Sequence, residues 1–271
     1  MESAFLGKLH YNMNIYIAVI SHGHSDLINQ LACLPLLSKE YQVVIKSNKS
    51  KDHFDSWIES PNLYWIDDQY GCGFGRNNNI VFEYCRSELR MTEEDYFIVL
   101  NPDVIIESKE IERLIDHMSV GGVKLSAINL LKDRNKMIYD QSIRKFPTLL
   151  QFVKSFLGLG NSSILDKSSL ISSSKVDWAA GSFLAFKSGH YAKLGGFDEN
   201  YFMYCEDIDI CYRSYLSGER VTYYPEISAL HLAKHANREL FSMHFYWHIT
   251  SALRFLLTKV GLTKKKSSLL E

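Results

Sequence analysis

Short apolar runs alternate with helix-like segments in the first hundred residues, and this alternation constrains the fold most strongly. Residues 15–20 form a nearly continuous apolar run, typical of a strand that is covered on both faces. Further strands are expected at residues 41–46, 63–66 and 96–100, with a helix at residues 77–89. Repeated β–α units predict a parallel sheet with ligand-binding loops at the carboxyl ends of its strands.

The second half is less regular, with strands expected at residues 123–130, 176–186 and 221–231 and a helix at 206–216. A chain of 271 residues, 46% of them hydrophobic, can bury one large α/β core. Because 31 acidic and 30 basic residues nearly cancel, we expect no nucleic-acid partner. Five cysteines without metal-binding spacing, no signal-peptide pattern and no long apolar run favour a cytoplasmic location.

Residues 195–213 gather five carboxylates, five aromatic side chains and a glycine pair. Carboxylates this close repel one another, and burying them costs several kcal/mol unless they are paired. Such a cluster is typical of an active site, where a carboxylate takes up a proton or meets a cation. Glu206 and Asp207 open the expected helix, and a carboxylate beside aromatic rings suits a general base. Helix capping is the alternative for Glu206 or Asp209, but it does not explain all three acids.

Asp103 follows the strand at residues 96–100, so we expect it in the crevice at the carboxyl end of the sheet. A divalent cation there would bridge Asp103 to a ligand diphosphate, although Asn-Pro-Asp is also ordinary turn chemistry. His231 ends a later strand and is a candidate second ligand, with a structural histidine as the alternative.

A glycine-rich loop at residues 71–75 precedes the expected helix, whose first N–H groups can bind an anion. Arg76 and Asn78 add hydrogen-bond donors beside it. A plain flexible turn is the alternative, because the spacing is not that of a dinucleotide-binding fingerprint.

Residues 240–262 are rich in aromatic and leucine side chains and precede three consecutive lysines at 264–266. A helix of this kind can lie in the headgroup layer of an anionic membrane. A core-packing helix with a solvated tail is the alternative. A second basic and apolar stretch at residues 144–154 favours membrane contact, so we expect peripheral association with the inner face of the cytoplasmic membrane.

Taken in order, these segments resemble the inverting GT-A glycosyltransferases of family 2. The resemblance is closest to bacterial rhamnosyltransferases that act on N-acetylglucosaminyl-diphospho-undecaprenol in O-antigen assembly. It covers most of the chain from about residue 14 to 247. The segments that carry it are ISHGH at 20–24, GFGRNNN at 73–79, LNPD at 100–103, RKFP at 144–147, DWAAGSF at 177–183, the cluster at 195–213, and His231.

The resemblance implies an α/β fold of the GT-A type, with a Rossmann-like, mostly parallel central sheet flanked by helices. It implies a catalytic domain at residues 1–239, with a nucleotide-sugar half at about 14–103 and an acceptor half at about 104–239. A basic amphipathic helix and tail would follow at residues 240–271.

The implied reaction moves L-rhamnose, with inversion, from dTDP-β-L-rhamnose to a polyprenyl-diphosphate-linked N-acetylglucosamine. Asp207 matches the catalytic base and Glu206 is its neighbour in the motif. Asp103 and His231 would hold Mg²⁺ or Mn²⁺. The remaining implied site residues are Ser21, Asn48, Arg76 and Asn78, with Asp103, for the donor, and Trp178, Gly181 and Ser182 for the acceptor.

Two positions depart from the family pattern. Asn101 replaces the first acid of the DxD-like motif, and Ser47 stands where relatives usually carry an Asp before Asn48. A family 2 transferase that uses a UDP-hexose or UDP-N-acetylhexosamine donor is therefore one alternative. A catalytically silent scaffold for polysaccharide assembly is the other.

Overall fold

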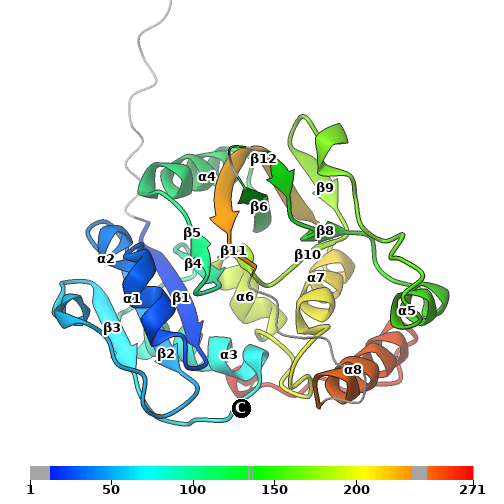
Figure 1. Cartoon of the computed structure of the whole chain (residues 1–271), viewed down its shortest axis with the longest axis horizontal. Coiled ribbons are helices and arrows are strands. Elements are labelled where there is room, and N and C mark those ends of the chain that lie inside the picture. Colours follow the sequence, from blue (N-terminus) through cyan, green and yellow to red (C-terminus); the bar gives the residue numbers. More distant parts are fainter. Residues whose placement is uncertain (1–12, 134, 136, 234–242, 271) are drawn as a thin grey trace, which may run out of the picture.

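One central sheet organises the chain. The computed structural model describes residues 13–133, 135, 137–233 and 243–270. Its main sheet has the strand order β3-β2-β1-β4-β11-β6-β12-β5 (Figure 1). In chain order these strands are β1 (Ile15–Ser21), β2 (Gln42–Ser47), β3 (Leu63–Ile66), β4 (Tyr96–Leu100), β5 (Val104–Ile105), β6 (Leu125–Asp133), β11 (Phe183–Lys187) and β12 (Val221–His231).

The first half of the sheet is parallel, as the β–α rhythm predicted. Strand β1 pairs in parallel with β2 and β4, and β2 pairs in parallel with β3. The four expected strands are confirmed to within one residue at each end. Helix α3 (Phe74–Ser87) is also confirmed, although it begins within the glycine-rich segment at residues 71–75, earlier than expected.

The second half is mixed, so the sheet is less parallel than expected. Strand β11 runs antiparallel between β4 and β6, whereas β12 is parallel to β6. The strand expected at 176–186 is divided into β9 (Ser174–Val176), β10 (Trp178–Ala179) and β11, because the chain turns at residues 180–182. Pro225 does not break β12; a register shift between Tyr224 and Ser228 accommodates it.

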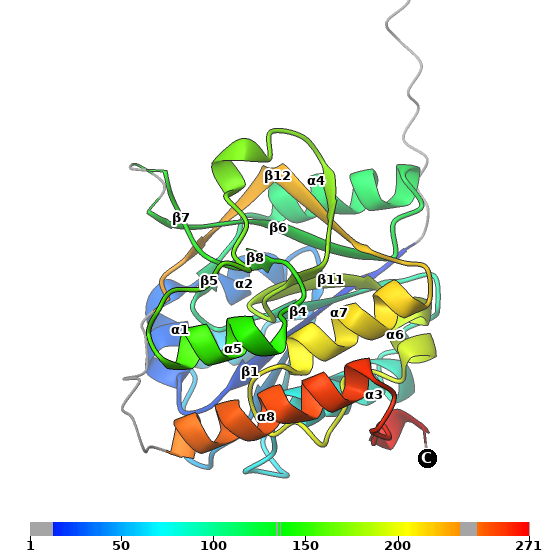
Figure 2. The same cartoon turned by 90° about the vertical axis from the view of Figure 1, so that its right-hand side faces the viewer.

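Helices cover both faces of the sheet (Figures 1 and 2). Helices α1 (Ser25–Leu31), α2 (Leu34–Leu37) and α4 (Ser108–Val120) bury Ile28 and Leu114 in one apolar cluster. Helices α3, α6 (Ser188–Leu194) and α7 (Glu206–Leu216) bury Phe82 and Tyr191 in the other. The smaller elements are β7 (Ile138–Tyr139), β8 (Ile143–Arg144), η1 (Ser56–Glu59), η2 (Lys167–Ser169) and η3 (Ser268–Leu270).

Helices α5 (Leu149–Phe156) and α8 (Met243–Lys259) lie side by side at one end of the molecule (Figure 2). Phe156 meets Phe245 across them, with ring centroids 6.0 Å apart. Phe255 of α8 is fully buried in the second apolar cluster, so one face of this helix belongs to the core. The expected domain boundary near residue 239 lies outside the described residues. Among the described helices, none is both long and apolar enough to cross a membrane.

Candidate active site

The short pairing of β5 with β12 brings Asp103 and His231 together. Val104 lies opposite His231 in this antiparallel pair, and the Leu232 N–H donates to the Asp103 carbonyl at 3.1 Å. As a result, His231 Nε2 lies 3.5 Å from Asp103 Oδ1. The two residues that the sequence predicted as metal ligands therefore meet at the carboxyl edge of the sheet.

A buried ion pair between Asp140 and Lys167 contacts the Nδ1 side of the His231 ring. Its Nδ1 lies 2.9 Å from Asp140 Oδ2, and Asp140 Oδ1 accepts a hydrogen bond from the buried Lys167 ammonium at 2.5 Å. Burial acts to lower the pKa of His231, but hydrogen bonds to Asp103 and Asp140 and their charges outweigh it and raise the pKa to about 9. Asp140 holds the ring with Nε2 toward Asp103, as carboxylates commonly do behind metal-binding histidines.

The two predicted catalytic acids are the first residues of α7, where the helix dipole favours negative charge. Asp207 accepts hydrogen bonds from the N–H groups of Gly181 (3.1 Å) and Ile208 (2.8 Å). Burial raises the pKa of the Asp207 carboxyl, and these two hydrogen bonds oppose that rise. Burial, reinforced by the Asp207 charge, raises the pKa of Glu206 well above its usual value. The hydrogen bonds therefore favour the charged form of Asp207, whereas the surroundings of Glu206 favour its neutral form.

A cavity of about 510 Å³ opens beside these acids, between α5, α8 and the start of α7. Asp207 and Glu206 lie at its wall, and Arg144 faces Trp178 there, with the guanidinium 5.3 Å from the ring centroid. Residues of α5 and α8, among them Phe156 and His248, form the wall nearest those helices. The cavity is large enough for a sugar with part of its aglycone.

Of the predicted acceptor residues, Trp178 lines this cavity and its Nε1 donates to the Lys145 carbonyl at 2.9 Å. Gly181 contributes its N–H to Asp207, so it positions the base. Ser182 is buried beneath, where its carbonyl accepts from the Asn101 N–H at 3.0 Å. The turn at residues 180–182 thus links the end of β4 to the base.

Two predicted donor residues meet where β1 and β2 end. The Asn48 N–H donates to the Ser21 carbonyl at 2.7 Å. The Asn48 side chain pairs with both backbone groups of Cys72, accepting from its N–H and donating to its carbonyl, each at 2.8 Å. Asn48 therefore fixes the glycine-rich loop to the sheet edge.

An acidic side chain, that of Asp52, lies at this edge although position 47 is a serine. Ser47 Oγ donates to Asp52 Oδ2 at 2.7 Å, and the Trp65 indole N–H donates to Ser47 Oγ at 2.9 Å. A carboxylate, that of Asp52, therefore lies one hydrogen bond away from position 47.

The glycine-rich loop packs against residues 195–205, the loop that precedes α7 and is called the catalytic loop. A Cβ on Gly73 would lie 2.5 Å from the Phe202 carbonyl oxygen, which accepts from the Phe74 N–H. Arg76 pairs with Glu199 at 3.2 Å, and Asn78 is buried, donating to the Phe74 carbonyl in its own helix. Of these two predicted donor residues, Arg76 thus connects α3 to the acidic cluster, whereas Asn78 forms its hydrogen bond within α3.

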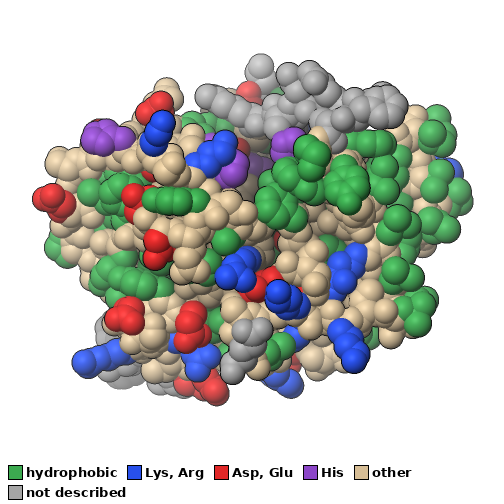
Figure 3. All heavy atoms as spheres, turned by 90° about the horizontal axis from the view of Figure 1, so that it is seen from below, with side chains coloured by type: hydrophobic (Ala, Val, Ile, Leu, Met, Phe, Trp, Pro, Cys, Tyr) green, Lys and Arg blue, Asp and Glu red, His purple; other side chains and the backbone are tan. Residues whose placement is uncertain are grey.

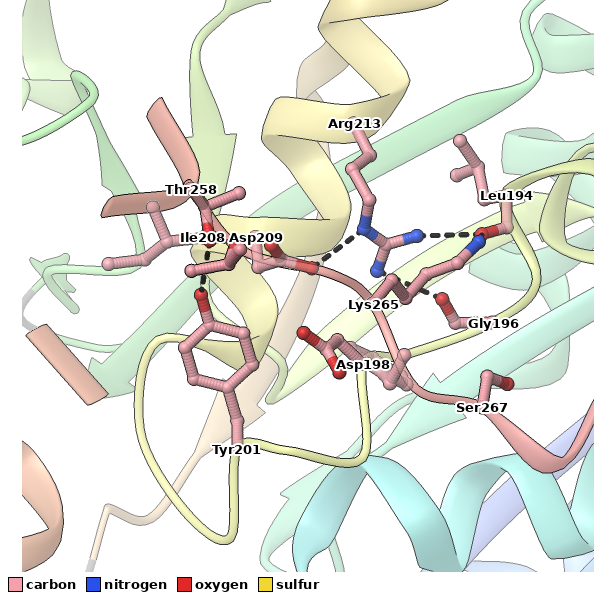
Figure 4. A network of polar contacts seen from close by, with 12 residues as sticks. Leu194, Gly196, Asp198, Tyr201, Ile208, Asp209, Arg213, Thr258, Lys265 and Ser267 are labelled. Atoms are coloured by element: carbon pink, nitrogen blue, oxygen red, sulfur yellow. Dashed lines mark hydrogen bonds and ion pairs between the residues drawn. The ribbon is translucent and has the colours of Figure 1, made fainter. Parts of the chain in front are cut away.

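Sequence reasoning missed three contributors. Asp140 and Lys167, which support His231, lie in segments without any recognisable motif, and Lys167 belongs to a serine-rich stretch. The third is the C-terminal tail. Lys265 does not extend into solvent, as the alternative of a solvated tail would require; its ammonium donates to the Leu194 carbonyl (Figure 4). Only their tertiary contacts distinguish these residues from ordinary surface positions.

The sheet order, the paired Asp103 and His231 at its edge and the acids at the start of α7 define a GT-A glycosyltransferase. Solved structures agree on the fold. The S. aureus TarS fragment 1–349 in complex with UDP-GlcNAc superposes with a TM-score of 0.57 at 12% identity, covering 94% of this chain and 69% of that fragment.

The curated relatives narrow the class, whereas no protein-family model matches the sequence. The chain is 37% identical over 247 residues to the rhamnosyltransferase WbbL of Escherichia coli K12, covering 90% of this chain and 93% of WbbL. It therefore belongs to the family of this rhamnosyltransferase. It is also 29% identical over 170 residues to the N-acetylglucosaminyl-diphospho-decaprenol L-rhamnosyltransferase of Mycobacterium tuberculosis, covering 60% of this chain and 55% of that protein.

Proposed function

We propose that this glycosyltransferase moves L-rhamnose from dTDP-β-L-rhamnose to N-acetylglucosamine carried on a polyprenyl diphosphate. The observation that carries the proposal is the Asp207 carboxylate, which two N–H groups hold at the wall of a sugar-sized cavity. The names of the relatives supply the sugar and the acceptor class.

In the proposed mechanism, Asp207 takes the proton from an acceptor hydroxyl bound in the cavity. The hydroxyl oxygen then bonds to the anomeric carbon as the bond from that carbon to the diphosphate oxygen breaks. A single displacement inverts the anomeric centre, so a β-linked donor gives an α-linked product. Trp178 and Arg144, which lies over the indole ring, would form the cavity wall on the acceptor side.

The residues at the sheet edge fit a divalent cation. Asp103 offers a carboxylate oxygen and His231 a ring nitrogen, within 3.5 Å of each other. No third His, Cys, Asp or Glu joins them among the described residues, so the donor diphosphate and water would complete the shell. Mg²⁺ or Mn²⁺ bound there would offset the negative charge of the leaving diphosphate.

A lipid-linked acceptor requires access to a bilayer surface, and the end formed by α5 and α8 suits one. Hydrophobic side chains gather at this end, with Lys and Arg beside them (Figure 3). No Asp or Glu occurs between residues 243 and 270 or between 141 and 165. The exposed apolar side chains are Leu149, Leu150, Val153, Leu157 and Leu159 near α5, and Met243, Tyr246, Leu253, Leu257, Val260 and Leu262 near α8. We include peripheral association with an anionic membrane in the proposal.

The test is a transfer assay with dTDP-rhamnose and a synthetic N-acetylglucosaminyl-diphospho-lipid, with Mg²⁺, with Mn²⁺ and with EDTA. Mass spectrometry is expected to detect a product heavier by one deoxyhexose, which is lost in EDTA. Product formed equally in EDTA would remove the metal from the proposal. Product from UDP-hexose or UDP-N-acetylhexosamine alone would replace the donor, and no product from any donor would favour the silent scaffold.

A further inference from the structure

The loop that leads into the catalytic acids has a strained backbone conformation at its end. Residues 195–205 contain no helix or strand. At their end, Tyr204 and Cys205 have φ angles of 70° and 63°, in the left-handed region that non-glycine residues rarely adopt. Each such residue costs on the order of 1 kcal/mol, so neighbouring structure must maintain the conformation.

The C-terminal tail pairs with the start of this loop. Asp198 accepts from the Arg254 guanidinium at 2.7 Å and from the Lys266 N–H at 3.0 Å. The Glu199 N–H donates to the Lys266 carbonyl at 2.8 Å, and the Glu199 carboxylate accepts from Ser268. Both carboxylates, which the sequence suggested were part of the active site, are therefore bound by α8 or the tail, and Glu199 also by Arg76 of α3.

Helix α8 contacts four consecutive residues of the loop, Tyr201 to Tyr204. The Tyr201 hydroxyl points toward Thr258 (Figure 4). The four pairs are Tyr201 with Thr258 (hydroxyl oxygens 3.3 Å apart), Phe202 with Trp247 (ring centroids 4.5 Å apart), Met203 carbonyl with Ser251 hydroxyl (2.9 Å) and Tyr204 hydroxyl with His244 Nδ1 (3.2 Å).

These contacts come from a single face of α8. Positions 244, 247, 251, 254 and 258 recur at helical spacing, so their side chains project from the same side. Seven consecutive loop residues, 198–204, thus contact α8 or the tail. A helix needed only for bilayer contact would not require this correspondence.

The glycine pair at the start of the loop, Gly195 and Gly196, leaves room for the tail. A Cβ on Gly195 would lie 2.7 Å from the Lys265 ammonium and 2.8 Å from Leu270 Cδ2. Gly195 and Gly196 also have φ angles of 64° and 60°. A side chain at position 195 would therefore both strain the backbone and displace the tail.

We propose that α8 and the tail, residues 243–270, form a template that positions the catalytic loop and thereby Glu206 and Asp207. This inference rests on the proposed role of Asp207 as the base. Residues such as Thr258 and Ser251 are positioning residues, because they act on the reaction only through the loop.

The test uses Thr258→Val in the full chain, because it removes one hydroxyl that contacts the loop at nearly constant volume. We expect kcat to fall about threefold to tenfold, because the hydroxyl loses its contacts with Tyr201 of the loop and Thr263 of the tail. The donor dissociation constant should be unchanged. Amide hydrogen exchange in residues 198–205 should become faster. Thr258→Ser, which keeps the hydroxyl, should restore both properties to those of the unmodified chain.

Thr250→Val is the matched control, because the Thr250 hydroxyl donates only to the Tyr246 and Trp247 carbonyls of its own helix. Tyr201→Phe combined with Thr258→Val should lose no more activity than either single variant. If Thr258→Val matches Thr250→Val in both kcat and exchange, the template proposal is wrong. Exchange requires no substrate, so an unmodified enzyme inactive with dTDP-rhamnose would count against the proposed function alone.

Discussion

At the scale of single residues, the two acids at the start of α7 have different surroundings although they are neighbours. Asp207 is half-buried and receives two N–H hydrogen bonds, whereas Glu206 is buried and its Oε2 has no hydrogen-bond partner among the described residues. We therefore expect Asp207 to take part in proton transfer and Glu206 to pack beside it in its neutral form.

This difference predicts opposite tolerance to amide substitution. Asp207→Asn should lower kcat by about 10²-fold to 10⁴-fold, because an amide cannot accept the proton, while donor affinity is retained. Glu206→Gln should lower kcat less than tenfold, because the amide matches the neutral acid in shape. Single-turnover assays and donor titration of both variants provide the comparison. Equal losses of kcat in the two variants would mean that both acids take part in proton transfer, and would contradict the separate roles of Asp207 and Glu206.

At the scale of elements, α8 has two faces with separate roles. Its inner face buries Phe255 and contacts the catalytic loop, whereas its outer face exposes Leu253 and Leu257, at 53% and 46%. The core-packing alternative describes the inner face, whereas membrane contact by the outer face stays a prediction. Amphipathic spacing alone does not distinguish them, because both predict the same apolar residues.

The outer face can be tested without disturbing the inner one. Leu253→Glu with Leu257→Glu should weaken binding to anionic phospholipid vesicles at least tenfold, because two apolar side chains are lost and two negative charges added. Transfer to a short-chain, water-soluble acceptor should be retained. Val120→Glu on α4, where the side chain is 93% exposed, is the control and should bind vesicles normally. Unchanged vesicle binding by the double variant would exclude this face as the docking surface.

At the scale of the whole molecule, a buried histidine couples stability to pH. His190 lies between α6 and α7, with Nε2 2.7 Å from the Ser214 hydroxyl oxygen. Burial lowers the pKa of His190 to about 4, whereas the pKa of a histidine in an unfolded chain is about 6.5. Between these values the unfolded state binds a proton that the folded state does not, so the free energy of unfolding falls as pH falls from about 6.5 to 4.

Urea denaturation between pH 7 and pH 4.5 should show this loss, on the order of 2 kcal/mol from His190. His190→Gln should be less stable at pH 7 but lose less stability on acidification. The exposed His53→Gln is the control and should follow the unmodified chain. A His190→Gln variant with the same pH slope as the unmodified chain would show that other groups cause the loss.

The sequence alone determined the parallel half of the sheet, since apolar runs with β–α spacing allow few other arrangements. It also indicated Asp103, Glu206 and Asp207, because motifs place them at the end of a strand and the start of a helix. The mixed half could not be predicted in this way. Antiparallel β11 and the break at residues 180–182 depend on pairing between distant strands, which local patterns do not encode.

Tertiary structure alone decided which polar groups meet. His231 faces Asp103 because β5 pairs with β12, and Asp140 and Lys167 stand behind it from segments without a motif. Asp198 and Glu199 belong to the acidic cluster in sequence, yet they bind the C-terminal tail. Charge and spacing identify residues capable of chemistry, but burial and partners fix their protonation and position, and both arise only when distant segments pack together.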